Sequence, residues 1–261
     1  MSNFGVFFTC FKEKVATEFA ISNLRTHNPD VPIFLISDGG TDFSYLESSY
    51  DMLKASIEED TRSCLYNISL ENFCEPEVQY KILKSASVFL ERISKAIEYT
   101  NREYILIMEP DNLVRGRLSV PEGAMITGTR INRAEDPCHN KVPLGWRKVL
   151  AEMPGSLDVD CWGATAPFLN CKAFRQVHNR IETDPDLLKK FCESDPRFGS
   201  YDILLPVLFG IFGYPEVINP EVVSANWNQD WRNTSYKLID SFYENHPKKG
   251  SQDFGLSGRG S

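Results

Sequence analysis

The first part of the chain alternates between short apolar runs and a segment with helical spacing. Apolar runs at residues 4–11 and 31–36 predict two strands. Between them, at residues 12–25, apolar side chains recur three or four positions apart, which predicts a helix. A strand, a helix and a second strand in this order build a parallel sheet through a right-handed crossover. The pattern therefore predicts an α/β protein.

The clearest helical pattern lies at residues 79–99 and leads into an unbroken apolar run at residues 104–108. The helix carries one apolar stripe, formed by Ile82, Ala86, Phe89, Leu90, Ile93 and Ile97. An apolar run without alternation is typical of a strand covered on both faces, in the middle of an α/β sheet. Residues 41–75 are less regular, and their apolar patch at residues 64–70 is a candidate third strand.

The second half of the chain predicts shorter elements. These are helices at residues 173–181 and 187–192, a helix opened by Asp202, and short strands at residues 124–129 and 217–218. Residues 130–147 are polar and interrupted by prolines and a glycine, which predicts a loop. Loops of this length inside a compact domain are often lids or acceptor sites.

Composition restricts the classes of function. The 261 residues suffice for one large domain or two small ones, and 42% hydrophobic with 25% charged residues is ordinary for a soluble globular protein. The net charge of −8 predicts no general attraction to nucleic acid or to an anionic membrane. No stretch of about 18 apolar residues occurs, so we expect no membrane-spanning segment.

The seven cysteines are scattered along the chain and include no Cys-x-x-Cys pair. Their spacing argues against a zinc site, and their odd number argues against a full disulfide framework. The amino terminus shows no basic region followed by a long apolar segment. We therefore expect a reduced, cytoplasmic protein.

Candidate chemistry follows the apolar run at residues 104–108, where Glu109 and Asp111 flank Pro110. Proline cannot donate to a sheet ladder, so the strand should end there. Acids at the carboxyl end of a buried strand lie where open α/β sheets bind ligands. Two such carboxylates can hold a divalent cation that also binds phosphate oxygens. The alternative is an acidic turn with no ligand.

The segment from Glu109 to Asp111 resembles the Asp-x-Asp motif of glycosyltransferases with the GT-A fold, with Glu in place of the first Asp. Across residues 85–117, the order of long helix, apolar strand, acidic pair and valine-containing exit is similar to that family. The resemblance covers about residues 4–120. Because the chain shows no amino-terminal anchor, it looks most like bacterial or viral members.

The resemblance implies a GT-A-like, Rossmann-type mixed sheet flanked by helices in a single α/β domain. We expect that domain at residues 1–250, with a nucleotide-binding half at 1–120, a sugar and acceptor half at 121–250, and a flexible tail at 251–261. It also implies Mn²⁺ or Mg²⁺ at Glu109 and Asp111, with a nucleotide-sugar as donor, UDP-sugars being favoured over GDP-sugars. The acceptor would be the hydroxyl group of a glycan or another molecule.

The resemblance also assigns residues that bind the donor. Thr9 and Phe11, after the first strand, and Asp38, after the second, would surround the base or the ribose. Asp38 has an alternative role in a simple Asp-Gly-Gly turn. Arg92, on the long helix, would face the donor, although a solvated helix face explains it equally well.

Further site residues follow from the same resemblance. Asp202 would take the proton from the acceptor hydroxyl, with Asp160 as the reserve candidate. A base in this role would mean inversion at the anomeric carbon, but an acid in the first turn of a helix is also favoured by the helix dipole. His246 would complete the metal site and Lys249 would meet the diphosphate, unless both belong to a solvated tail.

The expected function is metal-dependent transfer of a hexosyl or pentosyl group from a nucleotide-sugar to a hydroxyl. One alternative is a nucleotidyltransferase that makes nucleotide-sugars. Such enzymes usually carry a glycine-rich loop with Arg and Lys after the first strand, whereas residues 9–14 contain no glycine. The other alternative is a sugar-binding protein of the same fold without catalysis.

Overall fold

The computed structural model describes residues 2–61, 72–129, 145–157, 159, 166–195, 198, 201–226 and 229–242. Within these residues, seven strands form one mixed sheet in the order β3-β2-β1-β4-β7-β6-β8. The strands are β1 (Phe4–Cys10), β2 (Ile33–Asp38), β3 (Leu53–Glu58), β4 (Tyr104–Met108), β6 (Ile126–Gly128), β7 (Phe168–Asn170) and β8 (Glu216–Ile218). Strands β1 to β4 are parallel to one another, and β7 runs antiparallel to both β4 and β6. The prediction of a mixed α/β sheet is confirmed.

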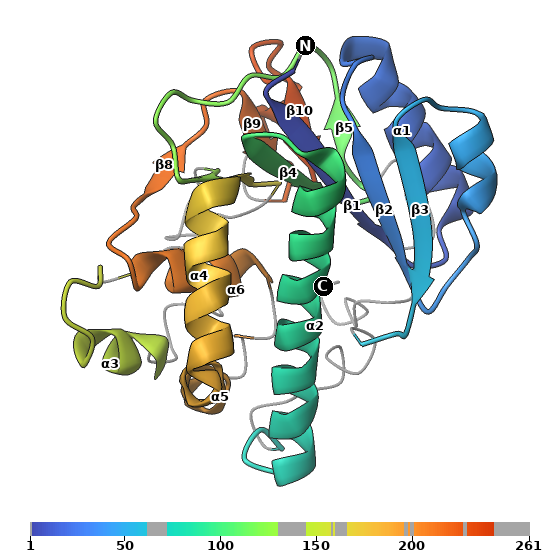
Figure 1. Ribbon diagram of the computed structural model, residues 1–261. Coiled ribbons are helices and arrows are strands. Elements are labelled where there is room, and N and C mark those ends of the chain that lie inside the picture. Colours follow the sequence, from blue (N-terminus) through green and yellow to red (C-terminus); the bar gives the residue numbers. More distant parts are fainter. Residues whose placement is uncertain are drawn as a thin grey trace, which may run out of the picture.

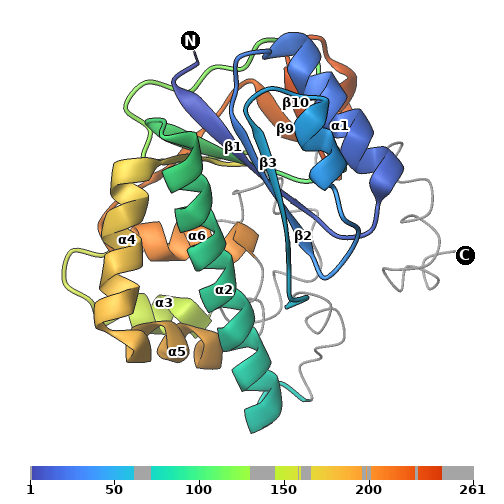
Figure 2. The same ribbon diagram turned by 45° about the vertical axis from the view of Figure 1, so that its right-hand side comes forward.

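Helices cover both faces of the sheet (Figure 1). They are α1 (Lys14–His27), α2 (Pro76–Thr100), α3 (Gly145–Ala151), α4 (Cys171–Thr183), α5 (Pro185–Ser194) and α6 (Tyr201–Gly210), with short 3-10 turns at Ser44–Ser48 and Gln229–Arg232. Figure 2 shows α1 on one side of the sheet, and α2 and α4 side by side on the other. The elements between residues 4 and 120 therefore place a central strand, β4, between two helical layers.

Each face of the sheet has its own hydrophobic core, and the strands contribute to both. In β1, Phe7 packs into the core formed with α2 to α6, whereas Val6 and Phe8 pack into the core formed with α1. This alternation follows from the two-residue period of a strand. Because both faces are buried, β1 and β4 are apolar at nearly every position, which explains the unbroken apolar runs.

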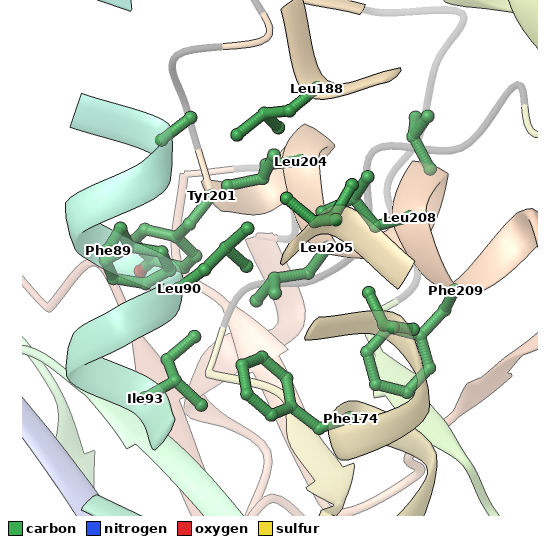
Figure 3. Packing of buried hydrophobic residues seen from close by; sticks show 14 of the residues in the cluster. Phe89, Leu90, Ile93, Phe174, Leu188, Tyr201, Leu204, Leu205, Leu208 and Phe209 are labelled. Atoms are coloured by element: carbon green, nitrogen blue, oxygen red, sulfur yellow. The ribbon is translucent and has the colours of Figure 1, made fainter. Parts of the chain in front are cut away.

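Helix α2 connects the sheet to the smaller helices. It begins at Pro76 and ends at Thr100, and the next residue, Asn101, adopts the left-handed conformation with φ 46°. Its apolar stripe meets side chains of α4, α5 and α6, and Figure 3 shows these residues directed toward one another. The labelled residues are Phe89, Leu90, Ile93, Phe174, Leu188, Tyr201, Leu204, Leu205, Leu208 and Phe209.

A second, smaller sheet lies beyond the end of β4. Its strands are β5 (Leu113–Val114), β9 (Val222–Ser224) and β10 (Leu238–Asp240), in the order β5-β10-β9. Strand β10 pairs antiparallel with β5 and parallel with β9. This sheet brings the chain near residue 240 against the segment that leaves the central strand.

Most of the predicted elements are confirmed within a few residues, and two regions differ. The irregular region after β2 contains a regular strand, β3, which the sequence analysis missed, and the candidate strand at residues 64–70 lies outside the described residues. The expected loop at residues 130–147 ends early because Gly145 begins α3, while residues 130–144 are not described. Among the described helices, none has the length and apolar character needed to cross a membrane.

Candidate functional site

The acidic turn after β4 is closed by its own hydrogen bonds. The backbone N–H of Asn112 donates to the carbonyl of Glu109 at 3.1 Å. In return, the N–H of Glu109 donates to Oδ1 of Asn112 at 3.0 Å. The turn holds Asp111 almost buried, whereas Glu109 is only half-buried. The strand ends at Met108, before Pro110, as the sequence predicts.

Strand β10 fixes this turn from the other side. Nδ2 of Asn112 donates to Oδ1 of Asp240 at 2.8 Å, and both side chains are buried. The N–H of Phe242 donates to the carbonyl of Asp111 at 2.7 Å. Asn112 and Asp240 are 128 positions apart in the sequence. The small sheet therefore adds a carboxyl group, that of Asp240, to the acidic turn.

The carboxyl group of Asp240 has a pKa well above its ordinary value. The main cause is complete burial, and repulsion by Asp111, Asp202 and Glu109 raises the pKa further. The hydroxyl of Ser241 donates to Oδ2 of Asp240 at 2.9 Å and partly offsets this rise. Three acids from α6 and the turn thus act electrostatically on the carboxyl group of Asp240 in β10.

This set of donors suits a hard divalent cation. Carboxylate oxygens are the ligands that Mg²⁺ and Mn²⁺ prefer, and a cation would remove the repulsion that raises the pKa of Asp240. Among the described residues, no three His, Cys, Asp or Glu side chains already form a metal centre. A cation would therefore have to draw the carboxylates together, so the residue types fit a metal ion but the site is not closed around one.

The other predicted donor-binding residues gather at the ends of the neighbouring strands. Arg92, on α2, places its guanidinium between two carboxylates: Nη2 lies 3.1 Å from Oδ1 of Asp38, and Nε lies 2.9 Å from Oε2 of Glu58. Nη2 also donates to the carbonyl of Glu59 at 2.8 Å. Arg92 and Asp38 are thus brought together, and the solvated helix face proposed as an alternative for Arg92 is wrong.

The hydrogen bonds of Asp38 exclude its alternative reading as a self-contained turn. Its Oδ1 accepts from the backbone N–H of Thr61 at 3.0 Å as well as from Arg92. Its Oδ2 is buried and has no hydrogen-bond partner among the described residues. The carboxylate therefore links three segments of the fold and keeps one acceptor oxygen unused.

The loops after β1 and β2 are joined to each other. The carbonyl of Phe11 accepts from the N–H of Thr41 at 3.0 Å and from the hydroxyl of Ser37 at 3.1 Å. Thr9 is buried within β1, whereas Phe11 is half-buried and its ring lies 4.4 Å from Nζ of Lys12. Both loops thus share one edge of the sheet, where the sequence analysis expected a base or ribose.

The predicted catalytic residues are only partly described. Asp202 lies in the first turn of α6, is half-buried and contributes to the repulsion on Asp240, so it belongs to the acidic group. Asp160, His246 and Lys249 lie outside the described residues. The assignment of a base, of a metal-binding histidine and of a diphosphate-binding lysine stays a prediction.

The sequence analysis missed Asp240. Its signal is short: two apolar residues, Leu238 and Ile239, followed by an acid. An acid also follows an apolar strand at Met108 and Glu109, and there the apolar run of residues 104–108 is long enough to be recognised as a strand. A search for acids that directly follow any apolar pair would have included Asp240.

Comparison with known proteins gives the class of fold. No protein-family model matches the sequence, and no curated protein matches it either. Solved structures do match, and the chain has the GT-A fold. Two of the matching structures are of the galactosyltransferase LgtC. A structure of LgtC with donor and acceptor sugar analogues matches with a TM-score of 0.55 and 11% identity, over 90% of this chain and 86% of that chain. A structure of an active-site mutant of LgtC matches over the same shares, with a TM-score of 0.53 and 13% identity.

Proposed function

We propose that this protein is a metal-dependent glycosyltransferase that moves a sugar from a nucleotide-sugar to an acceptor hydroxyl. One observation supports the proposal most directly. The acidic turn after β4 contacts the buried carboxyl group of Asp240, which comes from β10. Ligands of open α/β sheets bind at the carboxyl ends of the strands, where this turn lies in a GT-A fold. A solitary acidic turn would not need a second sheet to hold it. The repulsion among these acids supports a role for a cation.

Glu109, Asp111 and Asp240 would hold Mn²⁺ or Mg²⁺, and His246 remains a further candidate. When bound, the cation supplies positive charge that stabilises the departing nucleoside diphosphate. Lys249 would add a second positive charge at the diphosphate. Asn112 would keep the turn and Asp240 in register, because its side chain bonds to both.

Asp202 would act as the base for the acceptor hydroxyl. General-base catalysis needs an acid within hydrogen-bond reach of the proton that is removed. Asp202 lies in the first turn of α6 and repels the carboxylate of Asp240, which supports a position near the acids that we propose to hold the cation. Asp160 stays the reserve candidate, and a base in this role implies inversion.

The donor's base and ribose would lie against Thr9, Phe11 and Asp38. Oδ2 of Asp38, which has no hydrogen-bond partner among the described residues, is an acceptor at the edge of the sheet where β1 and β2 end. Arg92 would act mainly by holding Asp38 in place, because its guanidinium already contacts Asp38 and Glu58. UDP-sugars are the favoured donors and GDP-sugars the second choice.

A thermal-shift panel tests this function. The protein is heated with UDP-, GDP- or CMP-sugars, each with MnCl₂ or with EDTA. We expect one nucleotide class to raise the melting temperature only when Mn²⁺ is present, because ligand binding stabilises the folded state. Asp111→Ala should abolish this shift, whereas Asp186→Ala, at an exposed position on α5, should retain it.

Product analysis separates the candidate functions, in the samples with nucleotide-sugars and in parallel samples that contain a nucleoside triphosphate and a sugar phosphate. Slow release of free sugar and of the nucleotide, a diphosphate from UDP- or GDP-sugars and a monophosphate from CMP-sugars, indicates a glycosyltransferase. Release of pyrophosphate from a nucleoside triphosphate and a sugar phosphate indicates a nucleotidyltransferase. Binding with no product over many hours indicates a sugar-binding protein. If no nucleotide-sugar gives a shift that requires Mn²⁺, metal-dependent transfer from a nucleotide-sugar is rejected.

A further inference from the structure

The hydroxyl group of Ser224 is buried without a hydrogen-bond partner among the described residues. Ser224 is 2% exposed and ends strand β9. A buried hydroxyl without a hydrogen-bond partner destabilises the folded state, so such a group calls for a specific explanation. The explanation here comes from the position of Ser224 in the small sheet.

Ser224 lies directly beside Asp240. The two residues are paired in the parallel register of β9 and β10, so their side chains extend from the same face of the small sheet. The preceding pair on that face, Val222 and Leu238, packs into one hydrophobic core, which confirms the shared direction. The hydroxyl is therefore directed to the side of the sheet that carries the Asp240 carboxyl.

The neighbouring groups already have other partners. Oδ1 of Asp240 accepts from Asn112, and Oδ2 accepts from the hydroxyl of Ser241. The backbone carbonyl of Asp240 accepts from the N–H of Ala225 at 2.8 Å. Asp240 therefore has a donor on each carboxylate oxygen without Ser224. Among the described residues nothing bonds to the Ser224 hydroxyl, which leaves it available to a bound group.

We propose that the Ser224 hydroxyl oxygen is a ligand of the divalent cation that the acidic group binds. The inference rests on the proposed function, because it needs a cation beside Asp240. A hydroxyl oxygen is a hard donor like a carboxylate, and it adds a ligand without adding negative charge. That property matters at a site where Asp111 and Asp202 already repel the carboxylate of Asp240.

The first test measures Mn²⁺ binding alone, with no nucleotide, from the melting temperature at increasing MnCl₂. We expect Ser224→Ala to weaken the apparent Mn²⁺ affinity about tenfold, in the range found when one supporting group of a metal site is lost. The matched control is Thr100→Val. The hydroxyl of Thr100 is also buried and has no hydrogen-bond partner in the described part of the chain, but it lies at the end of α2, against Gly5 at the start of β1. This variant should keep the wild-type affinity.

The second test changes the preference for metals. Ser224→Cys replaces the hard oxygen with sulfur, which favours softer cations. We expect this variant to bind Mn²⁺ more weakly and Cd²⁺ more tightly than the wild type, whose seven cysteines are common to all variants. A residue that only fills space would not change the ratio of the two affinities.

The outcomes are distinguishable. If the wild type binds neither Mn²⁺ nor any nucleotide-sugar, the proposed function and this inference fail together. If the wild type binds Mn²⁺ and the two Ser224 variants bind both metals as the wild type does, the function stands and the role of Ser224 is rejected. If Ser224→Ala weakens only nucleotide binding, the hydroxyl contacts the nucleotide instead, and the inference is again rejected.

Discussion

Arg92 and Asp38 form an ion pair that is almost completely removed from solvent. Nη2 of Arg92 lies 3.1 Å from Oδ1 of Asp38, and the two side chains are 1% and 4% exposed. The same guanidinium binds Glu58 and the carbonyl of Glu59. It thus joins α2 to the ends of β2 and β3, at the edge where the nucleotide is expected.

Removing Arg92 should destabilise the protein strongly. Arg92→Ala leaves the buried carboxylate of Asp38 without its counterion, and breaking a buried pair in this way costs about 3–5 kcal/mol. Urea denaturation monitored by circular dichroism measures the free energy of unfolding. Lys84→Ala removes the exposed pair between Lys84 and Glu59 and should cost less than about 1 kcal/mol. Equal losses in the two variants would contradict the role of the buried pair.

Asp240→Asn should make the protein more stable at neutral pH in the absence of metal. In the folded protein, burial and repulsion from Asp111, Asp202 and Glu109 raise the pKa of Asp240. In the unfolded chain the same carboxyl group has its ordinary pKa and ionises near pH 4, at a lower pH than in the folded protein. The wild-type free energy of unfolding therefore falls as the pH rises from about 4 toward the pKa of the folded state. The amide cannot ionise, so the variant should lack this fall.

Urea denaturation in EDTA from pH 4 to pH 8 checks this prediction. Asp186→Asn, at an exposed position on α5, serves as the control and should follow the wild-type profile. Asp240→Asn should also lose its response to Mn²⁺ at pH 7. A variant less stable than the wild type at pH 7 would show that the ionised carboxylate is stabilising in the metal-free protein.

Asn112→Ala should lower both the melting temperature and the further rise in melting temperature that Mn²⁺ causes. The side chain of Asn112 bonds to Glu109 and Asp240, and its loss leaves buried groups unsatisfied at a cost of about 1–3 kcal/mol each. Asn28 is a matched control, since its buried amide accepts from the N–H of Leu118 at 2.9 Å and donates to the carbonyl of Gly116 at 3.4 Å, away from the acidic turn. Asn28→Ala should lower the melting temperature comparably but retain the Mn²⁺ shift, and loss of that shift in both variants would point to general destabilisation.

Gly40→Ala should disturb the expected nucleotide-binding edge. A methyl group at Gly40 would lie 1.8 Å from the carbonyl oxygen of Phe11, so one of the two loops must move, at a cost of about 3 kcal/mol. Gly123→Ala meets no atom within 4 Å and strains only the backbone, which has φ +71°, for about 1–2 kcal/mol. Isothermal titration with the stabilising nucleotide should show weaker binding for Gly40→Ala alone; unchanged binding would place the nucleotide elsewhere.

The sequence predicts the fold where apolar periodicity is long. Strands β1 and β4 and helix α2 are confirmed because each presents an extended pattern to a buried environment. Strand β3 was missed because it lies at the edge of the sheet and has only Leu53 and Ala55 buried. Strands β9 and β10 have three residues each, too few for a period to be recognised.

The candidate site was predictable only where its residues follow long elements. Glu109 and Asp111 directly follow the central strand β4, so their position at its carboxyl end could be inferred from the sequence. Asp240 joins them only through the pairing of two short strands, which depends on tertiary structure. The partners of Arg92 could not be inferred either, because helical spacing does not show whether a cation meets water or a buried carboxylate.

The pairing of β5 with β10 has a consequence for the order of assembly. A ribosome exposes the acidic turn long before it has added Asp240, because 128 positions separate Asn112 from that residue. Contacts between distant positions form late, since a long loop must first be closed. The nascent chain therefore carries an incomplete acidic group from the synthesis of the turn until Asp240 is added, and the contact between Asn112 and Asp240 forms only after synthesis has passed β10.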